Sequence, residues 1–309
     1  MAINIQNTNY NGEVLEKLLT LAATGNQIVE KGLLHVEPQI RNSLNIPRLK
    51  TTTMLQKRKE NPTVEDSKGN FNYSEKRLVP KDFMAFTVFN PRTFERIWRP
   101  WQPEGNLVFS QLPPEGQNAL LDALSKQVNF ELGDHYINGE YQENGSDTEL
   151  FDGIVIRMED DNDKVVVTSE ATTVLGRLDA LVNEIPDAIF EDSKLCIILS
   201  TADIRRYGQE LIDKPLKGID YTQATPEYYR GIRLESLSQW PEGLYVATLA
   251  SPDMDSNLWA AVNLADDERV IQIDKVSNMS ELYFFKMLMM ADTNIAFGEE
   301  VVWLDKRSA

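Results

Sequence analysis

Two polar, charged segments that mirror each other across a turn-forming cluster constrain this chain more than any other feature. Residues 48–59 are rich in threonine and basic residues, and a mirror segment at residues 71–79 follows after Asp66-Ser67-Lys68-Gly69-Asn70. Gly69 and Asn70 tolerate a positive φ, so the pattern predicts a long two-stranded β-hairpin. Because such a hairpin without an apolar face is marginal alone, we expect it to lie against a partner as an extended arm.

The hairpin lies in a basic block of an acidic chain. The 309 residues carry 31 Lys+Arg and 48 Asp+Glu, a net charge of −17. Residues 41–101 hold 13 basic and 6 acidic side chains, whereas the remainder is strongly acidic. Such a block fits either a nucleic-acid patch, with Trp98 and Trp101 among arginines, or a surface that docks on an acidic face of another copy. The net acidity argues against a surface built mainly to neutralise phosphate.

Composition narrows the setting. The one cysteine, Cys196, excludes an internal disulfide, and its apolar neighbours predict a buried, inert thiol. Residues 1–10 lack the basic and apolar regions of a secretory signal, and no uncharged run approaches the roughly 18 residues of a membrane span. We therefore expect a soluble, unexported protein that has no membrane partner.

Hydrophobic periodicity predicts a chain that mixes helices and strands. The longest predicted helix begins at Pro114 and runs to about Ile137. Thr168 or Ser169 is the expected cap of a helix that Pro186 disturbs, and residues 200–203 open another helix with a capping box. A further helix is expected at 13–29, and strands at 83–89, 149–158, 165–167, 195–199, 229–237, 244–250, 258–264, 270–276 and within 281–304.

Catalytic patterns are missing from the sequence. It contains no dinucleotide, P-loop, nucleophile-elbow or zinc-protease motif, and its two histidines, His35 and His135, are expected to be packed or capping residues. Residues 159–163 could offer calcium ligands but lack the loop's glycine and closing glutamate, so a solvated hairpin turn is expected there. We predict no enzyme activity, no metal and no cofactor, although a carboxylate-dependent hydrolase leaves no local signature and stays open.

Short motifs follow these elements in a fixed order: Leu150-Phe151-Asp152-Gly153-Ile154, Tyr229-Arg230-Gly231-Ile232-Arg233-Leu234, Trp240-Pro241-Glu242-Gly243 and Asn257-Leu258. Together with the hairpin and the long helix, they resemble the HK97-fold major capsid proteins of tailed bacteriophages along nearly the whole chain. The resemblance implies an α+β fold with four parts. These are an N-terminal arm (1–47), an E-loop hairpin (48–80), a P-domain with a spine helix (81–154 and 275–297) and an A-domain with a central sheet flanked by helices (155–274 and 298–309).

The resemblance implies a structural subunit that self-assembles into hexamers and pentamers of an icosahedral shell around phage DNA. Scaffolding, portal and decoration proteins are further partners it allows, DNA contact would be non-specific at most, and the location would be a virion capsid assembled in the host cytoplasm. Residues 1–40 do not resemble a long cleavable scaffolding segment. An encapsulin-like compartment is the nearest alternative. The expected intersubunit contacts are the hairpin cations, placed against carboxylates of another copy: Arg48, Lys50, Lys57, Arg58, Lys59 and Lys68.

Overall fold

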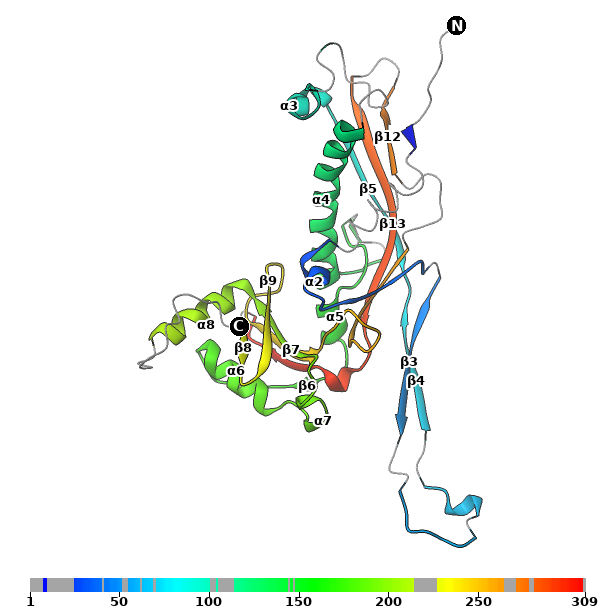
Figure 1. Ribbon diagram of the computed structural model, residues 1–309, viewed down its shortest axis with the longest axis vertical. Helices are drawn as coiled ribbons and strands as arrows, with labels where there is room; N and C mark the ends of the chain where they lie inside the picture. Colours follow the sequence, from blue (N-terminus) through cyan, green and yellow to red (C-terminus); the bar gives the residue numbers. More distant parts are fainter. Residues whose placement is uncertain are drawn as a thin grey trace.

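Strand pairing divides the chain among three sheets. The computed structural model describes residues 8–9, 25–40, 42–51, 55–61, 63–68, 71–100, 104, 114–143, 145–146, 148–213, 227–263, 271–277 and 281–307. One six-stranded sheet, the long sheet, runs beside the longest helix, and a second six-stranded sheet, the lobe sheet, forms the centre of a lobe. A two-stranded hairpin projects away from both (Figure 1). The predicted α+β class is confirmed.

The long sheet is organised around its 13-residue central strand, β13. Its strands run in the order β1-β12-β13-β11-β2, and β5 pairs with the opposite edge of β13. Over residues 283–290 of β13 alternate residues are buried, because successive side chains of a strand point to opposite faces, and residues 291–295 are all buried. The members of the sheet are β1 (Thr8–Asn9), β2 (His35–Pro38), β5 (Lys81–Phe89), β11 (Leu258–Asn263), β12 (Ile271–Lys275) and β13 (Tyr283–Ile295).

Helix α4 (Pro114–Asn138) covers the inner face of the long sheet, and its predicted bounds are confirmed to within one residue. Tyr136 of α4 is fully buried, 6.0 Å from the Phe151 ring between centroids, in the same core as Phe285 and Met287 of β13. The side chains of the first half of α4 lie outside the described residues. Packing of the second half of α4 and of residues 151–158 therefore keeps this part of the inner face of the long sheet away from water.

The strand predicted at residues 149–158 is wrong, because the chain forms helix α5 (Ile154–Glu159) there. The chain enters α5 by crossing α4 closely: Gly153 donates its N–H to the Gly139 carbonyl at 2.7 Å. A Cβ on either glycine would overlap a neighbouring carbonyl oxygen, so this crossing requires glycine. The apolar residues of α5 share one side of the helix, and those buried are Ile154, Val155 and Met158.

The lobe sheet has the order β6-β14-β10-β7-β9-β8, and its central strands β10 and β7 are buried on both faces. One face of β7 and β10 packs under helices α6 and α8, and the other joins the core beneath the long sheet. The elements of the lobe are β6 (Val165–Val166), α6 (Val174–Asn183), α7 (Asp187–Phe190), β7 (Leu195–Ser200), α8 (Thr201–Asp213), β8 (Tyr228–Tyr229), β9 (Ile232–Leu237), β10 (Leu244–Leu249) and β14 (Val302–Asp305).

The two predicted helix starts in the lobe have different outcomes. Thr173 caps α6, accepting from Gly176 N–H at 3.2 Å, so the predicted cap at Thr168 or Ser169 is wrong. Ser169 instead accepts from Ala171 N–H in a local turn. The predicted start of α8 at residues 200–203 is confirmed, because Asp203 N–H donates to Ser200 Oγ at 3.0 Å.

The predicted hairpin is confirmed. Strand β3 (Leu44–Thr51) pairs antiparallel with β4 (Phe71–Leu78), so it begins before residue 48. The segment between the strands spans residues 52–70 and includes the 3₁₀ turn η1 (Val64–Asp66), so it is longer than the turn expected at 66–70. We call residues 55–68 the tip, with residue 62 outside the description.

The hairpin has an apolar face at its root, contrary to expectation. Leu78 is fully buried and Ile46 nearly so, in a small cluster with Trp259, Ala261 and Ala296 of the body. The root of the hairpin is thus packed against the body of its own chain. Burial of this cluster supplies the stability that an isolated two-stranded hairpin lacks.

The remaining described elements are short, and one part of the prediction is untested. Most of the helix predicted at 13–29 lies outside the described residues. No helix in the described part of the chain is long and apolar enough to cross a membrane. The short elements are α2 (Gln27–Glu30), the 3₁₀ turn η2 (Pro91–Phe94), α3 (Glu95–Trp98) and the 3₁₀ turn η4 (Gly298–Glu300).

Truncating Leu78 should loosen the hairpin from the body. We expect Leu78→Ala to lower the free energy of unfolding by about 2–4 kcal/mol, because it removes a fully buried side chain and leaves a cavity. Leu55→Ala, a matched control whose side chain is 92% exposed, should change it by less than about 0.5 kcal/mol. Urea unfolding of the unassembled protein measures both, and equal losses would contradict the root packing.

Candidate intersubunit surfaces

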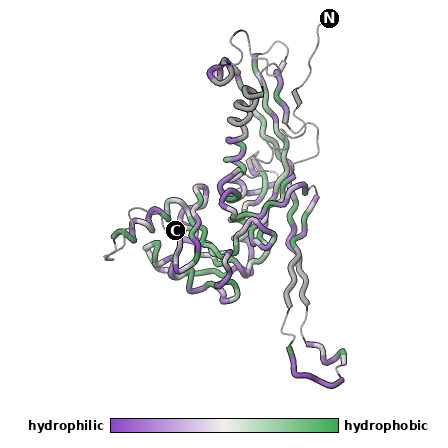
Figure 2. Tube along the Cα trace, in the orientation of Figure 1, coloured by the Kyte–Doolittle hydropathy of each residue, from purple (hydrophilic) through white to green (hydrophobic). Residues whose placement is uncertain are grey.

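The tip of the hairpin exposes both apolar and basic side chains. Leu55 and Val64 are 92% and 93% exposed, although large aliphatic side chains usually find cover in a folded protein. Figure 2 shows the tip as a mostly hydrophilic trace interrupted by short hydrophobic stretches. Lys57 and Arg58 are also exposed, and within the described residues they contact no carboxylate. These four side chains of the tip are therefore exposed to solvent in the part of the chain that the structure describes.

The six cations predicted to contact another copy fall into two groups. Arg48 and Lys50 lie on β3, opposite Ser74 and Asn72, and their side chains are outside the described residues. The other four are exposed at the tip, where Lys59 forms an ion pair with Asp66 of the same tip. Bonds from Lys59 and from Thr63 hold the pKa of Asp66 below its usual range. These four residues are Lys57, Arg58, Lys59 and Lys68.

A buried carboxylate of β13 holds the root of the hairpin. Asp292 is 2% exposed, accepts the Val79 N–H at 2.7 Å and pairs with Arg157 of α5 at 3.2 Å. Burial raises the pKa of Asp292, and the Val79 N–H and the Arg157 guanidinium oppose that effect. Arg157 also reaches Asp152 and donates to the Thr293 carbonyl. The Asp292 side chain thereby connects β13, α5 and the end of the hairpin.

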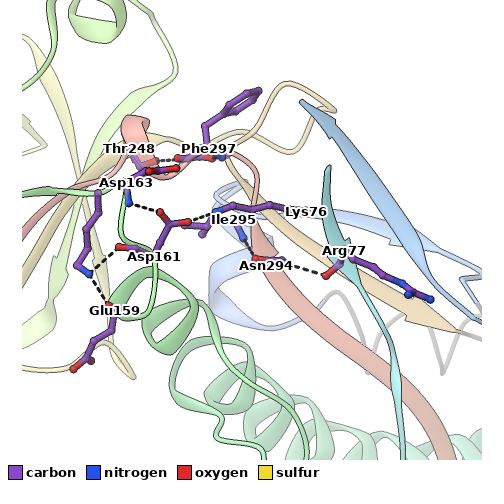
Figure 3. A network of polar contacts seen from close by, with 11 residues as sticks. Lys76, Arg77, Glu159, Asp161, Asp163, Thr248, Asn294, Ile295 and Phe297 are labelled. Carbon is purple, nitrogen blue, oxygen red and sulfur yellow. Dashed lines mark hydrogen bonds and ion pairs between the residues drawn. The ribbon is translucent and has the colours of Figure 1, made fainter. Parts of the chain in front are cut away.

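A second set of polar contacts binds β4 to the body (Figure 3). Lys76 of β4 forms an ion pair with Asp161, and Asn294 of β13 donates to the Arg77 carbonyl at 3.0 Å. Asp161 also accepts the Asp163 N–H at 2.8 Å. The acidic run 159–163 links a helix to β6, so the predicted hairpin turn is wrong, and its Asp161 anchors β4 instead of facing only solvent.

The outer face of the long sheet exposes a row of apolar side chains that sequence reasoning did not single out. Met84, Phe86 and Val88 of β5 are 60%, 55% and 46% exposed, and Leu288 of β13 is 38% exposed. Phe284 is half-buried beside Phe86, with ring centroids 6.2 Å apart. We call these five residues the outer face. In the segment 83–89, apolar residues occupy both the odd and the even positions, which point to opposite faces of a strand. This pattern was the sequence signal for a strand with two apolar faces.

Both histidines are packed, as predicted. His35 of β2 lies 2.7 Å from the Pro252 carbonyl oxygen through Nδ1 and edge-on to Trp259. His135 of α4 packs near Phe151, and burial lowers its pKa against the opposing charges of Asp134 and Glu131. Among the described residues no group of three or more His, Cys, Asp or Glu side chains could hold a metal ion.

Comparison with known proteins identifies the fold. The sequence matches no protein-family model and no curated protein. The structure matches one titled as the satellite phage P4 procapsid including its size determination (Sid) protein, with a TM-score of 0.66 and 12% identity over 98% of this chain and 93% of that one. The chain has the HK97-type capsid fold.

Two further structures support the same assignment. The capsid of Myoviridae phage XM1 matches with a TM-score of 0.57 and 9% identity over 90% of this chain and 91% of the other. The SrpI encapsulin complex of Synechococcus elongatus matches with a TM-score of 0.52 and 11% identity over 98% and 92%. At these identities the likeness is one of fold, and the HK97-type fold serves both phage capsids and encapsulin compartments.

Removing the charge of Asp292 should produce a pH-dependent gain in the free energy of unfolding. Because burial raises the pKa of Asp292, its folded state holds the proton more tightly than the unfolded chain, and stability from this group is lost as pH rises through the folded pKa. Asp292→Asn keeps an acceptor for the Val79 N–H. We expect the unfolding free energy of Asp292→Asn minus that of the wild type to be larger at pH 8 than at pH 4, because the difference grows from the unfolded pKa up to the raised folded pKa.

Asp292→Ala is the matched comparison. It leaves the Val79 N–H and the Arg157 guanidinium without this acceptor, and should be about 1–3 kcal/mol less stable than Asp292→Asn at every pH, because neither variant titrates at this position. Urea unfolding at several pH values measures both variants. A pH-independent difference between Asp292→Asn and the wild type would contradict the raised pKa.

Proposed function

We propose that this protein is the major capsid protein of a tailed bacteriophage, which self-assembles into hexamers and pentamers of an icosahedral shell that encloses DNA. The observation that carries the proposal is the hairpin, which is anchored at its root and projects a tip with exposed apolar and basic side chains beyond the body (Figure 1). The fold shared with the P4 procapsid structure supports it. The exposed apolar side chains at the tip of such an arm become covered when another molecule packs against them.

The parts of the chain take the roles implied by the HK97-type fold. Residues 1–47 act as the arm, the hairpin to residue 80 as the E-loop, α4 with the long sheet as the P-domain, and the lobe as the A-domain. Strands β11 and β12 pair with β13 in the long sheet, so we assign them to the P-domain instead of the A-domain range 155–274. Scaffolding, portal and decoration proteins are further partners, and contact with DNA is non-specific. The location is the virion capsid after assembly in the host cytoplasm.

A shell role needs no catalytic group, so the protein acts through coverage and mechanical strength. An encapsulin-like compartment is the second candidate, because the SrpI encapsulin complex shares the fold. The two candidates differ in what the shell contains. Particles isolated from the native host should contain DNA if the protein is a capsid subunit, and a cargo protein if it is a compartment subunit.

Electron microscopy and analytical ultracentrifugation of the purified protein test self-assembly. We expect pentamers, hexamers or closed particles whose abundance rises with protein concentration, because weak contacts repeated around each subunit add up. A species that stays monomeric at every salt and protein concentration would overturn the shell proposal.

Reversing the two tip cations should weaken assembly without unfolding the subunit. We expect Lys57→Glu with Arg58→Glu to lower the association constant of each contact about tenfold, equivalent to about 1.4 kcal/mol, and so to lower the assembled fraction. The thermal unfolding temperature should stay unchanged, because both side chains are exposed. Arg205→Glu with Lys306→Glu, two exposed cations of the lobe, is the control for net charge. Equal defects in both double variants would contradict a specific role for the tip.

A further inference from the structure

The segment that leads into the hairpin bridges the two large sheets. Residues 26–38, which we call the strap, contain α2 and β2. Near its start, Gln27 accepts the N–H and the hydroxyl of Ser238, just after β9 of the lobe, both at 2.8 Å, and Lys31 pairs with Glu235 of β9 at 3.3 Å. At its end, β2 pairs in parallel with β11 of the long sheet. The strap therefore ties the lobe to the long sheet.

His35 joins the strap to the loop that connects the same two sheets. This connecting loop, residues 250–257, runs from β10 of the lobe to β11 of the long sheet. Nδ1 of His35 lies 2.7 Å from the carbonyl oxygen of Pro252 in the loop, and Nε2 lies 3.1 Å from a carboxylate oxygen of Glu37. The residue is 9% exposed and its ring packs edge-on against Trp259. The ring is thus held between two oxygen atoms from two different segments.

Both ring nitrogens of His35 face acceptors. A neutral imidazole carries one N–H and one lone pair, so it can donate to the Pro252 carbonyl or to the Glu37 carboxylate, but not to both. Its other nitrogen then points a lone pair at an oxygen that has no proton to give. Only the imidazolium form donates at both positions, and its bond to the carboxylate is charge-assisted. The two hydrogen bonds therefore form together only when the ring holds two protons.

The charged groups around His35 have the sign that stabilises an imidazolium. Glu37 lies on the same face of β2, because it follows two positions later. The connecting loop contributes Asp253, which is exposed, and Asp255, which pairs with Lys194. Strand β11 carries no titratable side chain from one end to the other. Burial of the ring opposes its charge, whereas the Pro252 carbonyl and the Glu37 carboxylate offset that cost.

We propose that His35 is a pH-sensitive clasp for the strap. Below about pH 6, within the range in which histidine ordinarily titrates, the ring donates to both Pro252 and Glu37 and holds β2 against the connecting loop. Near pH 8 the ring is neutral, one of the two hydrogen bonds is lost, and the strap separates from the loop more often. Because strap and loop both connect the lobe to the long sheet, opening the clasp loosens that connection.

The direction of the pH effect follows from proton linkage. The folded subunit gains a hydrogen bond when His35 binds its second proton, and the unfolded chain gains none. The contribution of the clasp to stability is therefore present at low pH and decreases as the pH rises through the range in which His35 titrates. The clasp operates within a single subunit, so it is independent of the proposed shell role.

Hydrogen exchange of the full-length, unassembled protein, followed by mass spectrometry, tests the clasp. Protection factors, corrected for the intrinsic pH dependence of exchange, are compared at pH 5.5 and pH 8 for peptides that cover residues 33–38. We expect the wild-type protection of the strap to fall about tenfold across this range, because a charge-assisted hydrogen bond is lost and the strap opens locally. Peptides from the buried strand β7 should change far less and serve as the internal reference.

Glu37→Gln is the matched variant. A glutamine amide offers both an acceptor and a donor, so by rotating it can bond the ring in either protonation state. The strap of Glu37→Gln should therefore keep nearly the same protection at both pH values. His135→Gln, which alters the other of the two histidines and leaves the contacts of His35 in place, should keep the wild-type pH dependence. Asp292 is the same in all three proteins, so its own pH effect cancels from the comparison.

Nuclear magnetic resonance of protein labelled with nitrogen-15 in its histidine rings reads the protons directly. The chain has two histidines, so His135→Gln assigns both sets of signals. We expect both ring nitrogens of His35 to carry a proton at pH 5.5 and one of them to lose it by pH 8. A His35 ring that stays neutral at pH 5.5, or a Glu37→Gln strap whose protection falls as steeply as that of the wild type, would overturn the clasp.

Discussion

A single buried carboxylate determines where the hairpin points. Asp292 lies on the central strand of the long sheet, accepts the Val79 N–H at the end of the hairpin and pairs with Arg157 of α5. Burial of this charge is unfavourable, as its raised pKa indicates, and the arginine and the backbone donor offset that cost. The favourable geometry requires all three elements at once. A carboxylate in this position therefore couples the direction of the hairpin to the packing of the body.

A fixed root changes what the rest of the chain must do. If the hairpin could swing, its apolar tip could cover exposed residues of its own subunit and the protein could remain a monomer. Because Asp292, the Lys76–Asp161 ion pair and the buried Leu78 hold it outward, the tip and the outer face both stay exposed. In the proposed shell, the contacts inside the subunit thus leave these side chains exposed for contacts between subunits.

The elements that the sequence predicted well are those with a strong local pattern. The long helix from Pro114, the buried strand at 195–199 and the hairpin follow from periodicity and turn residues within a short window. The prediction for 149–158 was wrong because the six residues 154–159 mix apolar and polar side chains in a way that suits either a strand or a short helix. The close packing at Gly153 selects the helix. The contacts at the root were out of reach, since Asp292 and Val79 are 213 positions apart and no local pattern links them.

Charge and apolar burial have different roles in a contact of the proposed kind. The basic tip on an acidic chain drew attention to electrostatics, but exposed ion pairs contribute little to stability, with a median of about 0–1 kcal/mol, and salt screens them. Burial of Leu55 and Val64 would contribute more, about 1.5–3 kcal/mol for each fully covered side chain. The cations would instead raise the rate at which the tip of one subunit meets another subunit, and orient the two. Added salt should therefore slow assembly more than it dissolves shells that have already formed.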